Sequence, residues 1–421
     1  MSLITRYGKK AKRTWKLLGP GLITGSSDDD PSGIATYSQA GAAFGLMTLW
    51  TAILTFPLMA SMQEMCARIG LVTGEGLASA IKKNYSRRIL YVMLVFSFPA
   101  IVLNIGADIA GMGAVANLLI PFIPPSVFSI LFTALLIPSI IFWPYKKIAS
   151  IMKYLCLILL VYLIVPFIVK TDWTKVLAFS FFPEVEFDKN YIIILVAVLG
   201  TTISPYLFIW QASMEVEELK KKRKGFSVTK LVIRHMRIDI SYGMFYSNLI
   251  MYFIILTSGT VLYNAGVHQI DTVDQAALAL KPLAGHFSYL LFSLGILGTG
   301  FLAIPVLAGS LSYALAETFQ WEQGLDKKYK DAKAFYAIIA VSLIIGLLIN
   351  FIGISPIQAL IYTAVLYGLT SPVLIAIILF ICNNKKIMGE HINGLWSNSL
   401  GIITFLLMTF SGVALIWFYF N

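Results

Sequence analysis

Charged residues are scarce in this chain, and their scarcity argues against an ordinary soluble fold. Only 13% of the 421 residues are charged, whereas 58% are hydrophobic and the mean hydropathy is +0.80. Soluble domains carry about twice that share of charge. Apolar runs of about 20 residues, the length of a membrane-crossing helix, recur to the C-terminus. The sequence therefore predicts an all-α polytopic membrane protein.

Cysteine and histidine are also rare, which removes the usual ligands of a resident metal. Cys66, Cys156 and Cys382 lie at no metal or redox spacing, so we interpret them as packing residues. The four histidines lie near predicted helix ends or in loops, which indicates surface positions rather than proton relays; they are His235, His268, His286 and His391. We expect no resident cofactor.

The net charge of +11 is concentrated in short basic segments. Among these, "KKKRK" at 220–224 could bind nucleic acid, but a solvated cytoplasmic loop fits better between two apolar runs. We expect no nucleic-acid partner. The sequence predicts about eleven spans, at 17–43, 46–70, 88–118, 126–144, 150–169, 190–219, 236–259, 288–318, 333–352, 356–382 and 398–419. Basic loops then alternate with poorly charged ones, which predicts a plasma-membrane protein with its N-terminus cytoplasmic and its C-terminus outside.

Three consecutive carboxylates interrupt the first span, in "SSDDDPSG" at 26–33. Placing them in a loop would leave too short a first crossing and would invert every later basic loop. An ionised Asp at this depth costs about 2.5–3.5 kcal/mol, so water or a bound cation must compensate. An Asp N-cap with Pro31 at the first helical position is compatible with this depth. Pro31, Ser32 and Gly33 therefore predict two half-helices.

The sixth span carries a second interruption, from Gly200 to Pro205 in "GTTISP". A proline kink without a ligand role remains an alternative for Pro205 alone. Two breaks five spans apart predict inverted repeats, at about 17–169 and 190–382, with an extra helix at 398–419. Paired breaks of this kind indicate a binding site at mid-membrane.

The residues around these breaks resemble the NRAMP family of divalent-metal transporters. Asp30-Pro31-Ser32-Gly33 falls on that family's Asp-Pro-Gly-Asn motif, within "GPGLITGSSDDDPSGIATYSQAGAAFG". "LVTGEGLA" at 71–78, "ADIAGMG" at 107–113 and "PIQAL" at 356–360 resemble further family segments. The resemblance implies eleven helices in a LeuT-like inverted 5+5 repeat and transport of a divalent metal.

The chain departs from the family at two ligand positions. The metal-binding Asn falls on Gly33, and the Met of Met-Pro-His falls on Ser204. Hydroxyl, carbonyl and carboxylate oxygens suit Mg²⁺, and less exclusively Mn²⁺ or Ca²⁺, better than softer metals. We expect Asp30 and the Thr201 carbonyl as direct ligands, with Gly33 and Ser204 beside them. Possible outer-shell residues are Asp28, Asp29, Ser32, Tyr206 and Gln211, although Asp28 and Asp29 could instead be entrance charges.

Proton coupling is expected to be weak or absent. The family's sixth-helix histidines fall on Tyr206 and Gln211, which do not titrate near neutral pH. Asp108 of the third span matches an acid of the family's proton pathway, but the following Glu falls on Gly111. Asp108 could serve a proton or ion pathway, or it could be a buried acid satisfied by helix backbone.

These features resemble the NRAMP-related magnesium transporter branch, so the sequence predicts Mg²⁺ uptake, with Mn²⁺ as a further candidate cargo. The alternatives are a proton-coupled Mn²⁺/Fe²⁺ transporter of the ordinary type and an organic-solute symporter of the same fold, whose substrate carboxylate the aspartates would repel. An aspartyl protease is rejected because "IGAD" at 105–108 lacks the second glycine of its signature. Glu64 and Arg68 predict a helix-end salt bridge or, less simply, a gate. Asn104 and Gln358 are expected to face inward.

Overall fold

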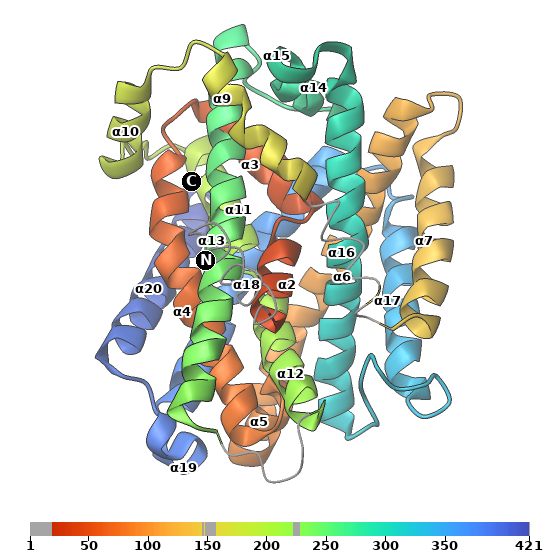
Figure 1. Ribbon diagram of the computed structural model, residues 1–421, viewed down its shortest axis with the longest axis vertical. Coiled ribbons are helices and arrows are strands. Elements are labelled where there is room, and N and C mark those ends of the chain that lie inside the picture. The colour runs from red at the N-terminus through yellow and green to blue at the C-terminus, as the bar shows by residue number, and fades with distance from the viewer. Residues whose placement is uncertain (1–18, 145–146, 148–156, 222–227, 421) are drawn as a thin grey trace, which may run out of the picture.

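The structure is a computed structural model that describes residues 19–144, 147, 157–221 and 228–420. All regular secondary structure within these residues is helical (Figure 1), which confirms the all-α prediction. Seven spans in this described part are long and apolar enough to cross a membrane, judged by length and composition.

The first and sixth predicted spans are each broken into two helices, as the sequence predicts. The first consists of α2 (Pro20–Asp28) and α3 (Pro31–Phe44), and the sixth of α11 (Lys189–Thr202) and α12 (Pro205–Lys221). In both, proline occupies the first position of the second half, where its missing N–H breaks no helical hydrogen bond. The breaks therefore lie where Pro31 and Pro205 place them.

The other long helices agree with the predicted spans to within a few residues. They are α4 (Leu49–Thr73), α6 (Arg87–Leu119), α7 (Pro125–Phe142), α13 (Lys230–Val261), α16 (Ser288–Phe319), α17 (Lys333–Ile349), α18 (Pro356–Cys382) and α20 (Leu395–Phe420). The largest difference is at α13, which begins six residues earlier than predicted. Thr229 caps it there, accepting a hydrogen bond from the Val232 amide at 3.4 Å.

The span predicted at 150–169 differs most from expectation, although residues 150–156 lie outside the described part. Its remainder is a 3₁₀ segment, η1 (Leu157–Leu163), followed by α9 (Val165–Ile168), rather than continuous α-helix. Short connecting helices were also not predicted: α5 (Leu77–Asn84), α10 (Trp173–Phe181), α14 (Val273–Ala277), α15 (Lys281–Ala284) and α19 (Lys385–Met388). They are too short to give a hydropathy signal.

The broken helices lie inside the bundle. α2 and α3 pack against α13, α11 packs against α18, and α12 packs against α4 and α16 (Figure 1). Small residues allow these contacts: a Cβ on Gly200 would collide with the Ala364 carbonyl and with Gly368. Such close backbone approach is typical of membrane helix interfaces.

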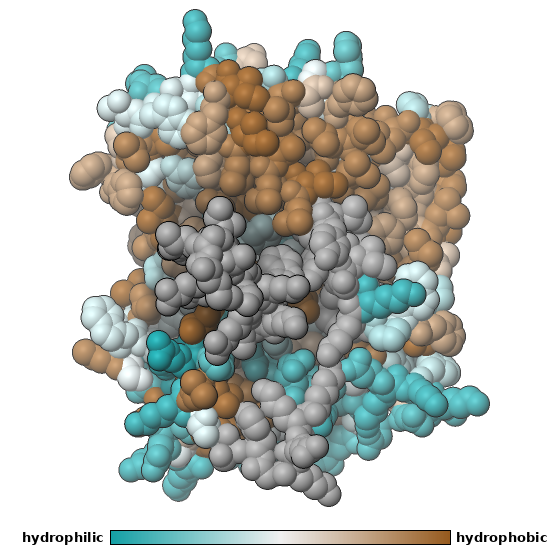
Figure 2. All heavy atoms as spheres, viewed as in Figure 1, coloured by the Kyte–Doolittle hydropathy of each residue, from teal (hydrophilic) through white to brown (hydrophobic). Residues whose placement is uncertain are grey.

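Hydrophilic and apolar side chains separate along the long axis of the molecule. Figure 2 shows most hydrophilic side chains at the lower end, where α5 and α19 lie, some at the upper end, and mainly apolar ones between. Both short helices carry basic residues in their last turn, Lys82 and Lys83 in α5 and Lys385 and Lys386 in α19. Two of the predicted basic loops therefore meet at one end.

Candidate metal site

The three aspartates form the break between α2 and α3 and lie fully inside the protein. Asp28 ends α2, Asp29 has non-helical backbone angles, and Asp30 is the N-cap of α3. Their exposed fractions are 0%, 1% and 1%. In this conformation Asp28 and Asp29 therefore do not face water as entrance charges.

Each carboxylate oxygen of Asp30 accepts a hydrogen bond, and Ser32 also interacts with this carboxylate. Oδ1 accepts from the Gly33 amide at 2.7 Å, and Oδ2 accepts from Asn104 Nδ2 at 2.9 Å. Thr363 Oγ1 donates to Asn104 Oδ1 at 2.9 Å, which fixes the orientation of that amide. A carboxylate has about four acceptor sites, so a cation or a water at Asp30 would share its oxygens with these donors. Asn104 faces inward as predicted, whereas Thr363 was missed because a lone threonine in an apolar helix gives no sequence signal.

Asp28 and Asp29 share a third residue, Ser247 of α13. Ser247 Oγ lies 2.7 Å from Asp28 Oδ2 and 3.2 Å from Asp29 Oδ1. The other oxygens, Asp28 Oδ1 and Asp29 Oδ2, are buried and have no hydrogen-bond partner among the described residues. Within the described residues, no group of three or more His, Cys, Asp and Glu side chains is arranged to hold a metal. A cation at Asp30 would therefore need backbone, hydroxyl or water oxygens as its remaining ligands.

The break between α11 and α12 presents such oxygens. Ser204 Oγ donates to the Gly200 carbonyl at 3.1 Å and also to the Thr201 carbonyl. Thr201 Oγ1 lies 3.4 Å from Ser32 Oγ, so the hydroxyls of the two breaks meet. The Ile203 carbonyl accepts from Ser371 Oγ of α18 at 2.8 Å, which satisfies a group freed by the break.

Gly33 lies beside the opposite break. A Cβ built there would lie 3.2 Å from the Asp28 carbonyl oxygen and 3.4 Å from both Thr201 Oγ1 and Tyr37 Cε2. Two of these three neighbours are oxygens, and the Thr201 hydroxyl belongs to the opposite break. A side chain at position 33 would thus displace oxygens from this region.

Tyr206 and Gln211, the residues at the family's histidine positions, connect α12 to α2. Tyr206 Oη donates to the Ser27 carbonyl at 2.9 Å. Gln211 Oε1 accepts from Thr24 Oγ1 at 2.6 Å, and its Nε2 donates to Glu215 at 3.1 Å. All of these residues are buried. In this conformation these hydrogen bonds hold α12 against α2.

Asp108 of α6 is fully buried, and its carboxylate interacts with the Ser32 backbone N–H at the start of α3. Within the described residues neither of its oxygens has a partner at strict hydrogen-bond geometry, so the alternative in which helix backbone satisfies this acid stays open. A buried carboxylate is costly and is typical of functional positions.

Oxygen and nitrogen dominate the surroundings of Asp30. Its carboxylate accepts hydrogen bonds from the nitrogen atoms of Gly33 and Asn104 and also interacts with Ser32. A sulfur atom approaches the second break at Met251, whose Sδ lies 3.6 Å from Thr202 Oγ1, one residue from Thr201. Thr202 Oγ1 also contacts Tyr37 Oη and the Val198 carbonyl. No described contact brings this sulfur to Asp30 or to the Thr201 carbonyl.

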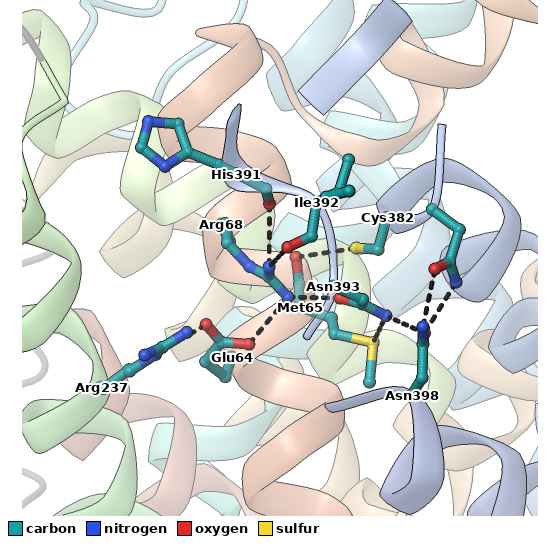
Figure 3. Close-up of polar contacts among 10 residues, drawn as sticks. Glu64, Met65, Arg68, Arg237, Cys382, His391, Ile392, Asn393 and Asn398 are labelled. Atoms are coloured by element: carbon teal, nitrogen blue, oxygen red, sulfur yellow. Dashed lines mark hydrogen bonds and ion pairs between the residues drawn. The ribbon is translucent and has the colours of Figure 1, made fainter. Parts of the chain in front are cut away.

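The predicted pair of Glu64 and Arg68 is present, at 3.0 Å, within a larger polar network (Figure 3). Arg237 of α13 binds the other Glu64 oxygen at 3.0 Å, and Arg68 donates to the His391 and Ile392 carbonyls. The network therefore joins α4 to α13 and to the segment before α20.

The cysteines and the histidines lie as the sequence predicts, and Gln358 does not. Cys66 and Cys382 are buried packing residues as predicted, while Cys156 lies outside the described part. His235, His268 and His286 are exposed and His391 is half-buried, which agrees with surface positions. The inward orientation expected for Gln358 is wrong: it lies in the first turn of α18 with its side chain exposed.

A family model described as "Natural resistance-associated macrophage protein-like" matches residues 21–418. A divalent metal cation transporter MntH from Caldanaerobacter subterraneus subsp. tengcongensis is 24% identical over 403 residues, covering 94% of this chain and 91% of the relative. The MntH of Listeria monocytogenes serotype 4a is 24% identical over 429 residues, covering 99% and 92%.

Solved structures share the fold. A crystal structure of the Eremococcus coleocola manganese transporter with an aromatic bis-isothiourea substituted compound has a TM-score of 0.78 at 17% identity, covering 96% of this chain and 87% of that one. Mhp1, a nucleobase-cation-symport-1 family transporter in a closed conformation, has a TM-score of 0.60 at 11% identity, covering 96% and 92%. At these identities the likeness shows the architecture alone, and it confirms the predicted transporter fold.

Proposed function

This chain belongs to the Nramp family, and we propose that it carries Mg²⁺ into the cytoplasm by alternating access. The matched relatives are named as transporters and not as enzymes. The broader assignment, a multi-pass membrane transporter of divalent metal cations, follows from the family. Mg²⁺ as preferred cargo, weak or absent proton coupling, and a cytoplasmic N-terminus with an outside C-terminus are our proposals. So are the repeats at about 17–169 and 190–382.

The observation that carries the Mg²⁺ proposal is the donor set at the two breaks. Asp30 supplies one carboxylate, and the opposite break supplies the Thr201 carbonyl and the Ser204 hydroxyl. Mg²⁺ typically binds through one or two carboxylates and keeps several waters. Gly33 and Ser204 leave no amide or thioether ligand at the positions where the family's motif carries Asn and Met. The remaining oxygens of Asp28 and Asp29 can accept hydrogen bonds from such waters.

The membrane potential is a sufficient driving force for uptake. Moving a divalent ion through 100 mV, inside negative, releases about 4.6 kcal/mol, or about three decades of concentration ratio. Tyr206 and Gln211 are engaged in hydrogen bonds with α2 and do not titrate near neutral pH. Asp108 is the remaining candidate for residual coupling.

Mn²⁺ with proton coupling is the second candidate, because the solved relatives from Eremococcus coleocola are named manganese transporters. Uptake into liposomes decides between the two. With protein reconstituted under an inside-negative potential, we expect Mg²⁺ entry without internal acidification, and loss of entry in Asp30→Ala. Strong Mn²⁺ uptake with proton influx and no Mg²⁺ entry would instead support the second candidate.

A further inference from the structure

A pocket of about 440 Å³ lies between α6, the end of α17 and the first half of α18. Its walls are almost entirely apolar and include Leu103, Ala107, Ile354 and Tyr362. The size falls in the range of small-molecule sites, and a few polar groups in an apolar wall are typical of them. The metal-site residues Asp28 to Asp30 do not line it.

The polar residues that line the pocket are Asn350, Tyr362 and Thr363, and Asn350 lies at one end. Asn350 follows the last residue of α17, and its Nδ2 is buried without a hydrogen-bond partner in the described part of the chain. α17 has 17 residues, so its length is about 25 Å, against a hydrocarbon core of about 30 Å. Asn350 therefore lies near the depth of the lipid ester groups. Thr363, about 10 Å further along α18 from its start, lines the pocket toward mid-membrane.

We propose that this pocket binds one acyl chain of a membrane phospholipid, whose ester carbonyl accepts a hydrogen bond from Asn350 Nδ2. The pocket opens on the surface that meets lipid, since Leu103, Ile354 and Tyr362 at its edge are 36%, 45% and 58% exposed. The amide nitrogen can only donate, so it requires an acceptor. A chain with a carbonyl at the interface and methylenes below matches the order of polarity in the pocket.

The same pocket lies two hydrogen bonds from the candidate metal ligand. Thr363 donates to Asn104, and Asn104 donates to Asp30, at 2.9 Å each. An acyl chain lying against α18 would thus hold Thr363 in place, and through Asn104 it would hold the orientation of Asp30. This effect on Mg²⁺ uptake rests on the proposed function, whereas lipid binding itself does not.

Photolabelling tests the binding without any transport measurement. Full-length protein is reconstituted with phosphatidylglycerol that carries a diazirine within one acyl chain, irradiated, and digested for mass spectrometry. We expect adducts on the pocket segments of α6 and α18 to exceed those on the lipid-facing side of α20, where Ile402, Leu406 and Phe410 are exposed. Equal labelling of the pocket and of α20 would overturn the proposal, because it would mean ordinary boundary lipid.

Two variants make the assignment specific. Asn350→Leu removes the donor and should lower pocket labelling about fivefold relative to α20. Ala359→Phe fills the pocket and should abolish it, whereas Ala414→Phe on α20, also a half-buried alanine, should not. Retained pocket labelling in both pocket variants overturns the proposal. Native mass spectrometry gives a second check. The same amount of co-purified phospholipid in the wild type and in Asn350→Leu, or none in either protein, also overturns the proposal.

If Asn350→Leu loses the lipid yet Asp30-dependent uptake is unchanged, the site stands and its link to transport is rejected. If neither protein takes up any divalent metal while the lipid signal differs as expected, the proposed function fails and the lipid site remains.

Discussion

The carboxylate of Asp239 caps the start of α2 from a different helix: its Oδ2 accepts the Gly21 amide at 2.7 Å, and Oδ1 accepts the Gly19 amide at the same distance. Asp239 lies on α13, 218 residues along the chain from Gly21. The first N–H groups of a helix have no partner within it, and a negative charge there is favoured by the helix dipole. α2, which ends at Asp28, is therefore bound to α13 at its N-terminal end.

We predict that Asp239→Ala releases this half-helix and opens the cytoplasmic side. The loss of an N-cap costs about 1–2 kcal/mol, so the closed state should lose about tenfold in population. A cysteine at position 26 reports the change, because Ser26 is buried and its side chain makes no hydrogen bond to another described residue. In a background without the native cysteines, its modification by an impermeant maleimide in inside-out vesicles should accelerate about tenfold.

Two variants serve as comparisons for Asp239→Ala. Asp239→Asn keeps one acceptor oxygen and should fall between wild type and alanine. Asp271→Ala removes an exposed carboxylate that binds Gln269, away from α2, and should leave the rate unchanged. Equal labelling rates in Asp239→Ala and Asp271→Ala would show that this cap does not hold α2 closed.

Asn104→Leu is predicted to weaken cation binding without unfolding the protein. The change removes the donor to Asp30 Oδ2 and leaves that oxygen free to reorient. A hydrogen bond to a charged group contributes about 1.5–3 kcal/mol, so the KM for Mg²⁺ uptake should rise at least about tenfold. Thr363→Val removes the hydroxyl that donates to Asn104 and should have a smaller effect in the same direction.

Thr370→Val is the matched control for Thr363→Val on the same helix. Among the described residues its hydroxyl bonds only carbonyls of α18 itself, at Leu366 and Tyr367. An equal rise in KM for Thr370→Val and Thr363→Val would show that general disturbance of α18, and not the orientation of Asp30, causes the effect.

The two breaks could be predicted from sequence because each rests on local chemistry. Asp30 caps a helix, Pro31 and Pro205 start one, and both effects act over a few residues. The buried depth of the aspartates followed from counting basic loops. The ends of α13 and α17 were misplaced because hydropathy changes gradually there.

The residues that complete the site could not be found in this way. Two of them lie on α13 and bond the first broken helix, Ser247 at Asp28 and Asp239 at Gly21. Thr363 of α18 bonds Asn104, which in turn bonds Asp30. No local pattern encodes contacts across such sequence separations. Asn104 gave a partial signal, an amide within an apolar helix, but nothing in the sequence names Asp30 as its partner. Gln358 gave the same signal and proved exposed, so polarity alone does not give direction.

Ser204→Met is predicted to shift preference from Mg²⁺ toward Mn²⁺. The change replaces a hydroxyl that contacts the Thr201 carbonyl with a thioether, which favours softer metals. Ser204→Leu has similar bulk without sulfur and controls for overpacking, which costs about 1–3 kcal/mol at a buried position. The ratio of Mn²⁺ to Mg²⁺ uptake in liposomes should rise for methionine and not for leucine. A rise in both would assign the effect to size and count against the oxygen-ligand argument.

Gly33→Asn is better tested as an addition to Ser204→Met than by itself. Its Cβ would lie 3.2 Å from the Asp28 carbonyl oxygen, so the break must shift before the amide can reach a cation. We expect Gly33→Asn alone to lower uptake of both metals, and the double variant to recover Mn²⁺ uptake in part. An identical ratio of Mn²⁺ to Mg²⁺ uptake in wild type and double variant would contradict the assignment of these positions to the ion.

Arg68→Ala is predicted to destabilise the protein far more than Arg237→Ala, although both arginines bind Glu64 (Figure 3). The Arg68 side chain is 3% exposed and that of Arg237 is 55% exposed. Removing the buried partner leaves Glu64 poorly compensated and the His391 and Ile392 carbonyls without their donor, a loss of about 3–5 kcal/mol. Removing the exposed partner should cost about 1 kcal/mol or less because water screens that pair. Thermal unfolding in detergent should therefore show a large fall in Tm for Arg68→Ala and a small one for Arg237→Ala. The reverse order would contradict this prediction. It would mean that the contact between α4 and α13, rather than the one with the segment before α20, stabilises this end of the protein.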